Sequence, residues 1–215
     1  MTIRLLLADD HPIYRAGLRL LLEKQPDVEI LAEFGDGLGA VEAARTQKPD
    51  LVVIDVSMPG MNGLEATRRI TAESPRVKVL CLSMHSDRRF VDAALRSGAR
   101  GYLLKECALE QLVSAIRAVL AGQIYVSPGL GDVVLDGYRA EGHVGSALSL
   151  LTSREREVLQ LLAEGHATID IAKRLCVSVK TVGTHREHLM QKLRTQSLSG
   201  LTKFAIREGL TSAEE

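Results

Sequence analysis

The chain has 215 residues, of which 46% are hydrophobic and 25% are charged, and its formal net charge at pH 7 is zero. This composition is typical of globular proteins, and the length fits one large or two small domains. No apolar run approaches the ~18 residues that a membrane-spanning helix needs, and no signal-peptide pattern is present. The three cysteines are widely spaced, so we expect a cytoplasmic protein without membrane contact.

In the first 121 residues, apolar runs typical of strands alternate with segments of helical spacing. Short apolar runs, typical of strands buried on both faces, occur at residues 3–8, 28–32, 51–54, 77–83 and 101–104. Helical spacing follows each run, beginning at Pro12 and then covering residues 37–47, 64–72, 87–97 and 109–121. Repeated strand–helix units predict an α/β doubly wound fold, a five-stranded parallel sheet with helices on both faces.

At residue 122 the pattern of alternating strands and helices ends. Six glycines and one proline between residues 122 and 147 predict a linker, with a short apolar patch at residues 133–135 and a turn or two of helix. From residue 148 the spacing is helical. The spacing of Thr152 and Glu155 predicts a capping box. Thr168 and Ser178 are the expected N-caps of a short helix to residue 175 and a long one to residue 194. With a last helix at about residues 198–208, a small all-α domain is predicted over residues 148–215.

Charge is distributed unevenly between these parts. Residues 1–124 hold 16 basic and 16 acidic residues, whereas residues 168–207 hold eight Lys and Arg against two acidic residues. A neutral first part and a basic second part indicate separate tasks.

Carboxylates gather at the predicted strand ends. Asp9 and Asp10 follow the first strand and Asp55 follows the third, so parallel pairing places all three side by side. Crowded carboxylates repel one another, and charge and desolvation both raise their pKa values. A hard cation such as Mg²⁺ removes this conflict, because it binds one or two carboxylates together with phosphate oxygens. A carboxylate can also act as a nucleophile and form an aspartyl-phosphate.

Two further residues stand at strand ends. Ser83 ends the fourth strand and Lys105 follows the fifth, and a hydroxyl and an ammonium group can both bind phosphoryl oxygens. Each residue alone fits a solvated strand end equally well, but the whole set favours a phosphoryl site. His11 is more simply explained as a surface or helix-start residue, because the carboxylates suffice for Mg²⁺.

Residues 3–121 resemble the receiver domain of two-component response regulators, whose flavodoxin-like sheet has the strand order 2-1-3-4-5. The matching motifs are Leu-Ala-Asp9-Asp10-His-Pro, Asp55-Val-Ser-Met58-Pro59-Gly-Met-Asn-Gly63, Leu-Ser83 and Gly101-Tyr102-Leu-Leu-Lys105. The resemblance implies that Asp55 is the phosphoacceptor, that Lys105 pairs with the phosphoryl group, and that Ser83 and Tyr102 form a switch pair. The implied Mg²⁺ ligands are Asp10, Asp55 and the backbone carbonyl of Ser57, with Asp9 acting through water.

The basic part contains a predicted helix-turn-helix at residues 168–175 and 179–194. Ala172 and Val182 supply the small and the apolar residue that the helix crossing needs, and Cys176 occupies a turn position that often holds glycine. The motifs Leu151-Thr-Ser-Arg-Glu155-Arg-Glu-Val-Leu and Ser178-Val-Lys-Thr181-Val182-Gly-Thr-His185 resemble the LuxR-type DNA-binding domain. The whole chain therefore resembles the NarL/FixJ class of response regulators.

This second resemblance implies that the long helix enters the major groove of promoter DNA. The predicted DNA-binding residues are Lys180, Thr181, Gly183, Thr184, Arg186, Glu187, His188 and Lys192. Gly183 reaches no base edge, and Glu187 can only accept, for example from a cytosine amino group, so the DNA sequence stays open.

Together the two parts predict that a sensor histidine kinase phosphorylates Asp55 with Mg²⁺ present. The phosphorylated protein is expected to form a homodimer and to regulate transcription, and not to be an enzyme. Three alternatives stay open. A phosphohydrolase is disfavoured because Ser57 stands where a second acid is needed, and a ligand sensor because a compact sheet leaves no roomy pocket. A receiver that never sees phosphate is disfavoured by the complete pocket.

Overall fold

The computed structural model describes residues 2–130 and 147–211. The chain divides into two compact units, Met1–Glu141 and Gly142–Glu215, and each is described by itself. Within the described ranges no helix combines the length and the apolar character needed to cross a lipid bilayer.

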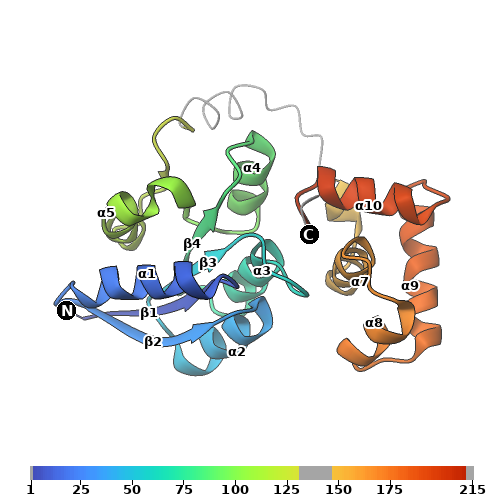
Figure 1. Ribbon diagram of the computed structural model, residues 1–215, viewed down its shortest axis with the longest axis horizontal. Helices are drawn as coiled ribbons and strands as arrows, with labels where there is room; N and C mark the ends of the chain where they lie inside the picture. Colours follow the sequence, from blue (N-terminus) through green and yellow to red (C-terminus); the bar gives the residue numbers. More distant parts are fainter. Residues whose placement is uncertain (1, 131–146, 212–215) are drawn as a thin grey trace. The chain divides into compact units, whose positions relative to one another are not determined.

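The first unit is a parallel sheet with helices on both faces (Figure 1). Its strands are β1 (Ile3–Ala8), β2 (Val28–Phe34), β3 (Leu51–Asp55), β4 (Lys78–Ser83), β5 (Gly101–Leu104) and β6 (Tyr125–Val126). They lie in the order β2-β1-β3-β4-β5-β6, and all neighbouring strands are parallel. The direction of winding reverses at β1, so the predicted doubly wound α/β architecture is confirmed.

Two apolar layers hold this sheet between its helices. The helices are α1 (Pro12–Glu23), α2 (Gly37–Gln47), α3 (Gly63–Glu73), α4 (Arg88–Arg96), the short 3-10 helix η1 (Lys105–Cys107) and α5 (Ala108–Leu120). Successive side chains of a strand point to opposite faces. Leu6 and Ala8 therefore pack with residues of α2, α3 and α4, whereas Leu5 and Leu7 pack with residues of α1 and α5. Both faces of β3, and of β1 from Leu5 to Ala8, are buried, which explains their continuous apolar runs.

The sixth strand corrects the predicted count of five. β6 lies inside the range 122–147 that was predicted as a linker, and its residues pair with Gly101 and Tyr102 of β5. Ser127 follows it, and its Oγ accepts a hydrogen bond from the Leu104 backbone N–H at 2.9 Å. A strand of two residues has no alternating pattern, which is why periodicity missed it. The apolar patch at residues 133–135 lies outside the described residues.

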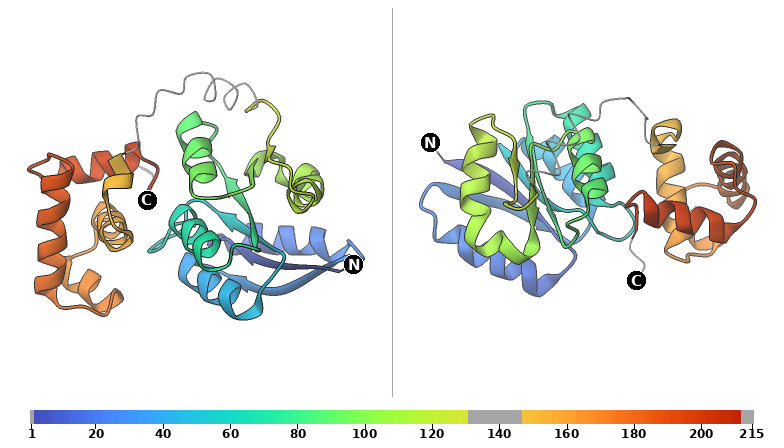
Figure 2. Two further views of the ribbon diagram at one scale, coloured as in Figure 1. Left: turned by 180° about the vertical axis from the view of Figure 1, so that it is seen from behind. Right: turned by 90° about the horizontal axis from the view of Figure 1, so that it is seen from above.

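The second unit is helical throughout the residues that the structure describes (Figure 2). It contains a 3-10 helix η2 (Ala147–Leu150), α7 (Ser153–Ala163), α8 (Thr168–Arg174), α9 (Val179–Lys192) and α10 (Leu198–Arg207). The predicted capping box of Thr152 and Glu155 is confirmed at the start of α7. Ser178 also caps α9 as predicted, because its Oγ accepts from the Thr181 N–H at 3.0 Å.

The predicted N-cap at Thr168 is wrong. Ala167 occupies that position without a side-chain cap, and Thr168 is the first helical residue. Two backbone hydrogen bonds close the end of α7: the Gly165 N–H donates to the Leu162 carbonyl, and the His166 N–H donates to the Leu161 carbonyl. Only Ala167 then separates this turn from α8. The connection between the helices therefore overrides a cap preference worth only about 1 kcal/mol.

Candidate functional site

Four polar side chains converge at the carboxyl edge of the sheet. Asp9 follows β1, Asp55 ends β3, Ser83 ends β4 and Lys105 follows β5, and all four are buried. Neighbouring strands end at one edge because they run parallel, so the structure brings these predicted site residues together. Asp10 stands one residue further along and is partly buried.

The Lys105 ammonium bridges two of the carboxylates. Its Nζ lies 2.9 Å from Asp9 Oδ2 and 2.8 Å from Asp55 Oδ2. Burial alone would lower the pKa of Lys105, but Asp55 and Asp9 outweigh burial and raise it, so the group stays positively charged. Tyr14 holds this lysine from α1: its hydroxyl donates to the Lys105 carbonyl at 3.2 Å, and its ring centroid lies 4.9 Å from Nζ. Sequence reasoning missed Tyr14, since nothing in its spacing marks it.

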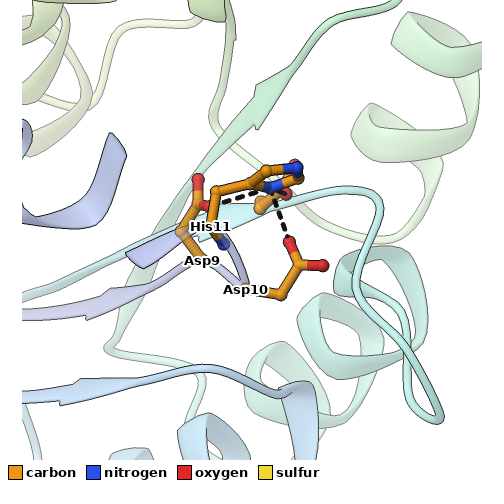
Figure 3. A group of neighbouring side chains, drawn as sticks. Asp9, Asp10 and His11 are labelled. Atoms are coloured by element: carbon orange, nitrogen blue, oxygen red, sulfur yellow. Dashed lines mark hydrogen bonds and ion pairs between the residues drawn. The ribbon is translucent and has the colours of Figure 1, made fainter. Parts of the chain in front are cut away.

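The pocket holds more negative charge than one lysine can balance. Burial raises the pKa of the Asp55 carboxyl, Lys105 lowers it and the Asp9 carboxylate raises it again, to about 7. One oxygen each of Asp9, Asp10 and Asp55 and a nitrogen of His11 lie within 4.8 Å of one another. Figure 3 shows Asp9, Asp10 and His11 of this group. Asp10 Oδ1 is buried as an atom, and its contact is with His11 Nδ1 at 2.9 Å. These observations fit a divalent cation, for which oxygen donors are the usual ligands.

The loop between β3 and α3 holds Asp55 through its backbone. The Ser57 N–H donates to Asp55 Oδ1 at 3.2 Å, and the Gly63 N–H donates to the Val56 carbonyl at 2.9 Å. A Cβ at Gly63 would lie 1.9 Å from the Asp55 carbonyl oxygen. Only glycine fits this close approach of two backbones.

The predicted switch pair is joined by the loop that follows β4. Ser83 Oγ accepts from the His85 N–H at 3.0 Å, and the buried Tyr102 hydroxyl donates to the His85 carbonyl at 2.7 Å. The His85 ring stacks on Phe90 of α4 at 4.1 Å. A movement of the Ser83 hydroxyl would therefore disturb a loop in contact with both Tyr102 and α4.

The helix-turn-helix consists of α8, a tight turn and α9. Ala172 and Val182 are buried in the core of the domain, as predicted. Cys176 adopts a left-handed φ of 53° in the turn, which explains why glycine suits this position.

Most of the predicted DNA-binding residues are exposed along α9. The exposed ones are Lys180, Thr181, Thr184, Arg186, Glu187, His188 and Lys192, and Gly183 is partly exposed. Several of them line a hollow of about 250 Å³ that also includes Ser178 and His185. Sequence reasoning assigned no role to His185, whose Nδ1 is buried and has no hydrogen-bond partner among the described residues. Their contacts with DNA stay predictions.

Lys192 has a partner that the sequence did not reveal. Its Nζ lies 2.7 Å from Oε2 of the buried Glu155, 37 residues away, and this pair ties α9 to the start of α7. Burial would raise the pKa of Glu155, but hydrogen bonds from Lys192 and Thr152 hold it below its usual value. The Lys192 ammonium therefore stabilises the fold of the domain. Its predicted contact with DNA is a separate role.

We expect Lys192→Met to destabilise the second unit by about 1–3 kcal/mol, because it removes the charged partner of a buried carboxylate. Urea unfolding followed by circular dichroism measures this loss. Lys180→Met is the control, and since Lys180 is exposed on the same helix its effect should stay within about 0.5 kcal/mol. Equal stability of the two variants would show that the Glu155 pair contributes nothing.

An acidic pocket at the edge of a doubly wound sheet and a helix-turn-helix domain together define the class of protein as a regulator with a receiver part and a DNA-binding part. Two family descriptions match these parts: "Response regulator receiver domain" covers residues 5–117, and "Bacterial regulatory proteins, luxR family" covers residues 149–205. The chain belongs to the two-component response regulators that join a receiver domain to a LuxR-type DNA-binding domain and regulate transcription.

Individual relatives agree with this assignment. The oxygen regulatory protein NreC of Staphylococcus carnosus is 36% identical over 214 residues, which cover 97% of this chain and 99% of the relative. A LuxR-family response regulator from Aurantimonas sp. SI85-9A1 is 37% identical with a TM-score of 0.61 and covers 65% of this chain and 99% of its own. RcsB of Salmonella enterica serovar Typhimurium, solved bound to a promoter with the phosphomimetic BeF₃⁻, is 26% identical with a TM-score of 0.62 over 98% of this chain and 100% of its own.

Proposed function

We propose that a sensor histidine kinase phosphorylates Asp55, and that this modification controls dimerisation of the protein and its binding to promoter DNA in the cytoplasm. The observation that carries the proposal is the Lys105 ammonium held between Asp9 and Asp55. A buried carboxylate can act as a nucleophile, and the fixed ammonium beside it would neutralise the charge of the product, an acyl phosphate.

The chemistry is a transfer between two side chains. An Asp55 carboxylate oxygen attacks the phosphorus, an O–P bond forms, and the P–N bond to the donor histidine breaks. Lys105 neutralises the phosphoryl oxygens, and the Ser83 hydroxyl leaves the His85 N–H to donate to one of them. Mg²⁺, when bound, would balance the remaining negative charge, with Asp10, Asp55 and the Ser57 carbonyl as ligands and Asp9 acting through water. Because the chain then only receives and loses its own phosphoryl group, we do not class it as an enzyme.

The output is binding of double-stranded DNA by α9. The exposed basic residues Lys180 and Arg186 would bind phosphates, which position the helix in the major groove. The Thr184 hydroxyl and the Glu187 carboxylate, on the same helix, would contact the base edges. Dimerisation would place two such helices on adjacent half-sites, with α10 as the contact between DNA-binding domains.

Selection from a random-sequence duplex pool tests this function. The full chain, treated with acetyl phosphate and Mg²⁺, should enrich a two-half-site motif and bind it more tightly than the untreated chain does. Lys180→Ala should lower affinity for the selected duplex by about 10-fold and reduce the salt dependence by about one ion. Lys24→Ala, an exposed lysine of the receiver domain, should change neither. Failure of both forms to enrich any motif would overturn the DNA-binding role.

A further inference from the structure

His11 points at the acidic pocket rather than away from it. Its Nδ1 lies 2.9 Å from Asp10 Oδ1 and 3.4 Å from Asp9 Oδ1 (Figure 3). It lies 4.0 Å from Asp55 Oδ2. The residue occupies the N-cap position of α1, but its side chain makes no cap hydrogen bond. A role in starting the helix therefore does not explain where the ring lies.

The backbone fixes this placement. The His11 N–H donates to Asp9 Oδ1 at 2.8 Å, which holds the turn after β1 against the pocket. Lys105 contacts the other oxygen of Asp9, Oδ2. The Lys105 ammonium and the His11 imidazole thus approach Asp9 through different oxygens, whereas both face Oδ2 of Asp55.

The separations match ligands of one metal ion. With bonds of about 2.0–2.2 Å, adjacent octahedral ligands lie roughly 3 Å apart and opposite ones roughly 4.3 Å apart. The distances from His11 Nδ1 to Asp10 Oδ1 and to Asp55 Oδ2, 2.9 Å and 4.0 Å, fall in this range. His11 Nδ1 and Asp10 Oδ1, 2.9 Å apart, form the shortest contact between the imidazole and the carboxylates, and a cation bound by both atoms would replace that contact.

An imidazole changes which ion such a pocket prefers. Carboxylates and water suit Mg²⁺, whereas imidazole nitrogen suits Zn²⁺ and other first-row transition metals. We propose that His11 is a fourth ligand of the pocket and makes it bind a divalent transition-metal ion more tightly than Mg²⁺. This inference rests on the proposed function only in placing a cation on Asp10, Asp55 and the Ser57 carbonyl.

Metal titrations of the full chain test the assignment. Isothermal titration with Zn²⁺ and, separately, with Mg²⁺ compares wild type with His11→Ala and His11→Asn. Both variants should bind Zn²⁺ about 10- to 100-fold more weakly, because the nitrogen ligand is lost. Asn offers an oxygen in place of the nitrogen, so His11→Asn should bind Mg²⁺ within about 3-fold of wild type. His166→Ala, in the other unit, is the matched histidine control and should alter neither affinity.

Pulsed EPR with Mn²⁺ gives a readout that is independent of affinity. Wild type should show ¹⁴N coupling from a directly bound imidazole, and the coupling should vanish in both His11 variants and persist in His166→Ala. Mg²⁺ binding with no ¹⁴N coupling and no loss of Zn²⁺ affinity on His11 substitution would overturn the inference and leave the proposed function intact. Absence of Mg²⁺ binding in wild type would instead count against the proposed function.

Discussion

The Asp55→Asn variant is expected to take up no phosphoryl group from acetyl phosphate and Mg²⁺. Asn keeps the shape of the side chain, but its amide oxygen is not a nucleophile and the Lys105 ammonium loses one of its two anionic partners. Electrophoresis on a phosphate-affinity gel should show a shifted band for wild type and none for the variant. EDTA should remove the wild-type band as well, since the proposed transfer needs a divalent cation.

Two controls show that the variant loses phosphorylation because the acceptor group is changed and not because the protein unfolds. Asp92→Asn changes an acidic residue on α4, outside the pocket, and should be phosphorylated like wild type.

The Asp55→Asn variant should also keep its fold. Because the pKa of Asp55 is raised to about 7, the folded state binds a proton that the unfolded chain releases near pH 4, and stability falls as pH rises between these values. Asp55→Asn should therefore be the more stable protein at pH 8 without metal. A shifted band in this variant would mean that another side chain accepts the phosphoryl group.

The second large effect is expected from Gly63→Ala. The new Cβ would lie 1.9 Å from the Asp55 carbonyl oxygen and 2.8 Å from its carbonyl carbon, and backbone atoms cannot turn aside as a flexible side chain can. We expect a loss of about 3 kcal/mol or more in the free energy of unfolding, the scale of severe overpacking. Displacement of the Asp55 backbone should also slow phosphorylation by at least about 10-fold, because small shifts of reacting groups are costly.

Gly17→Ala is the matched control for this substitution. Gly17 lies inside α1, and a Cβ there would meet no atom within 4 Å. Alanine is the better helix former, so the variant should gain about 0.5–1 kcal/mol. Urea unfolding gives both values, and the phosphate-affinity gel gives the rates. If Gly63→Ala kept wild-type stability and rate, the loop would have room that the structure does not show.

The parts of the site that could be predicted follow from two regular features. Continuous apolar runs mark strands buried on both faces, and parallel pairing brings their carboxyl ends to one edge. Asp9, Asp55, Ser83 and Lys105 were therefore foreseeable as neighbours. The cap at Ser178 was foreseeable for a similar reason, since it depends on residues only three apart.

The missed features depend on tertiary geometry. Tyr14 meets Lys105 only because α1 packs beside the end of β5, and Lys192 meets Glu155 only because α9 crosses α7. The direction of the His11 ring depends on one rotamer at the end of β1. No local pattern in the chain carries any of these, and the two-residue strand β6 is too short to have a period.

The position of β6 has a practical meaning for anyone who isolates the receiver domain. A fragment that ends at residue 121, where the helical pattern stops, would lose Ser127 and leave the Leu104 N–H without its acceptor. It would also uncover the outer edge of β5, beside Lys105, and bare sheet edges recruit other chains. Such a fragment would therefore be prone to self-association unrelated to phosphorylation, whereas one that extends through the buried Leu130 keeps the native edge closed.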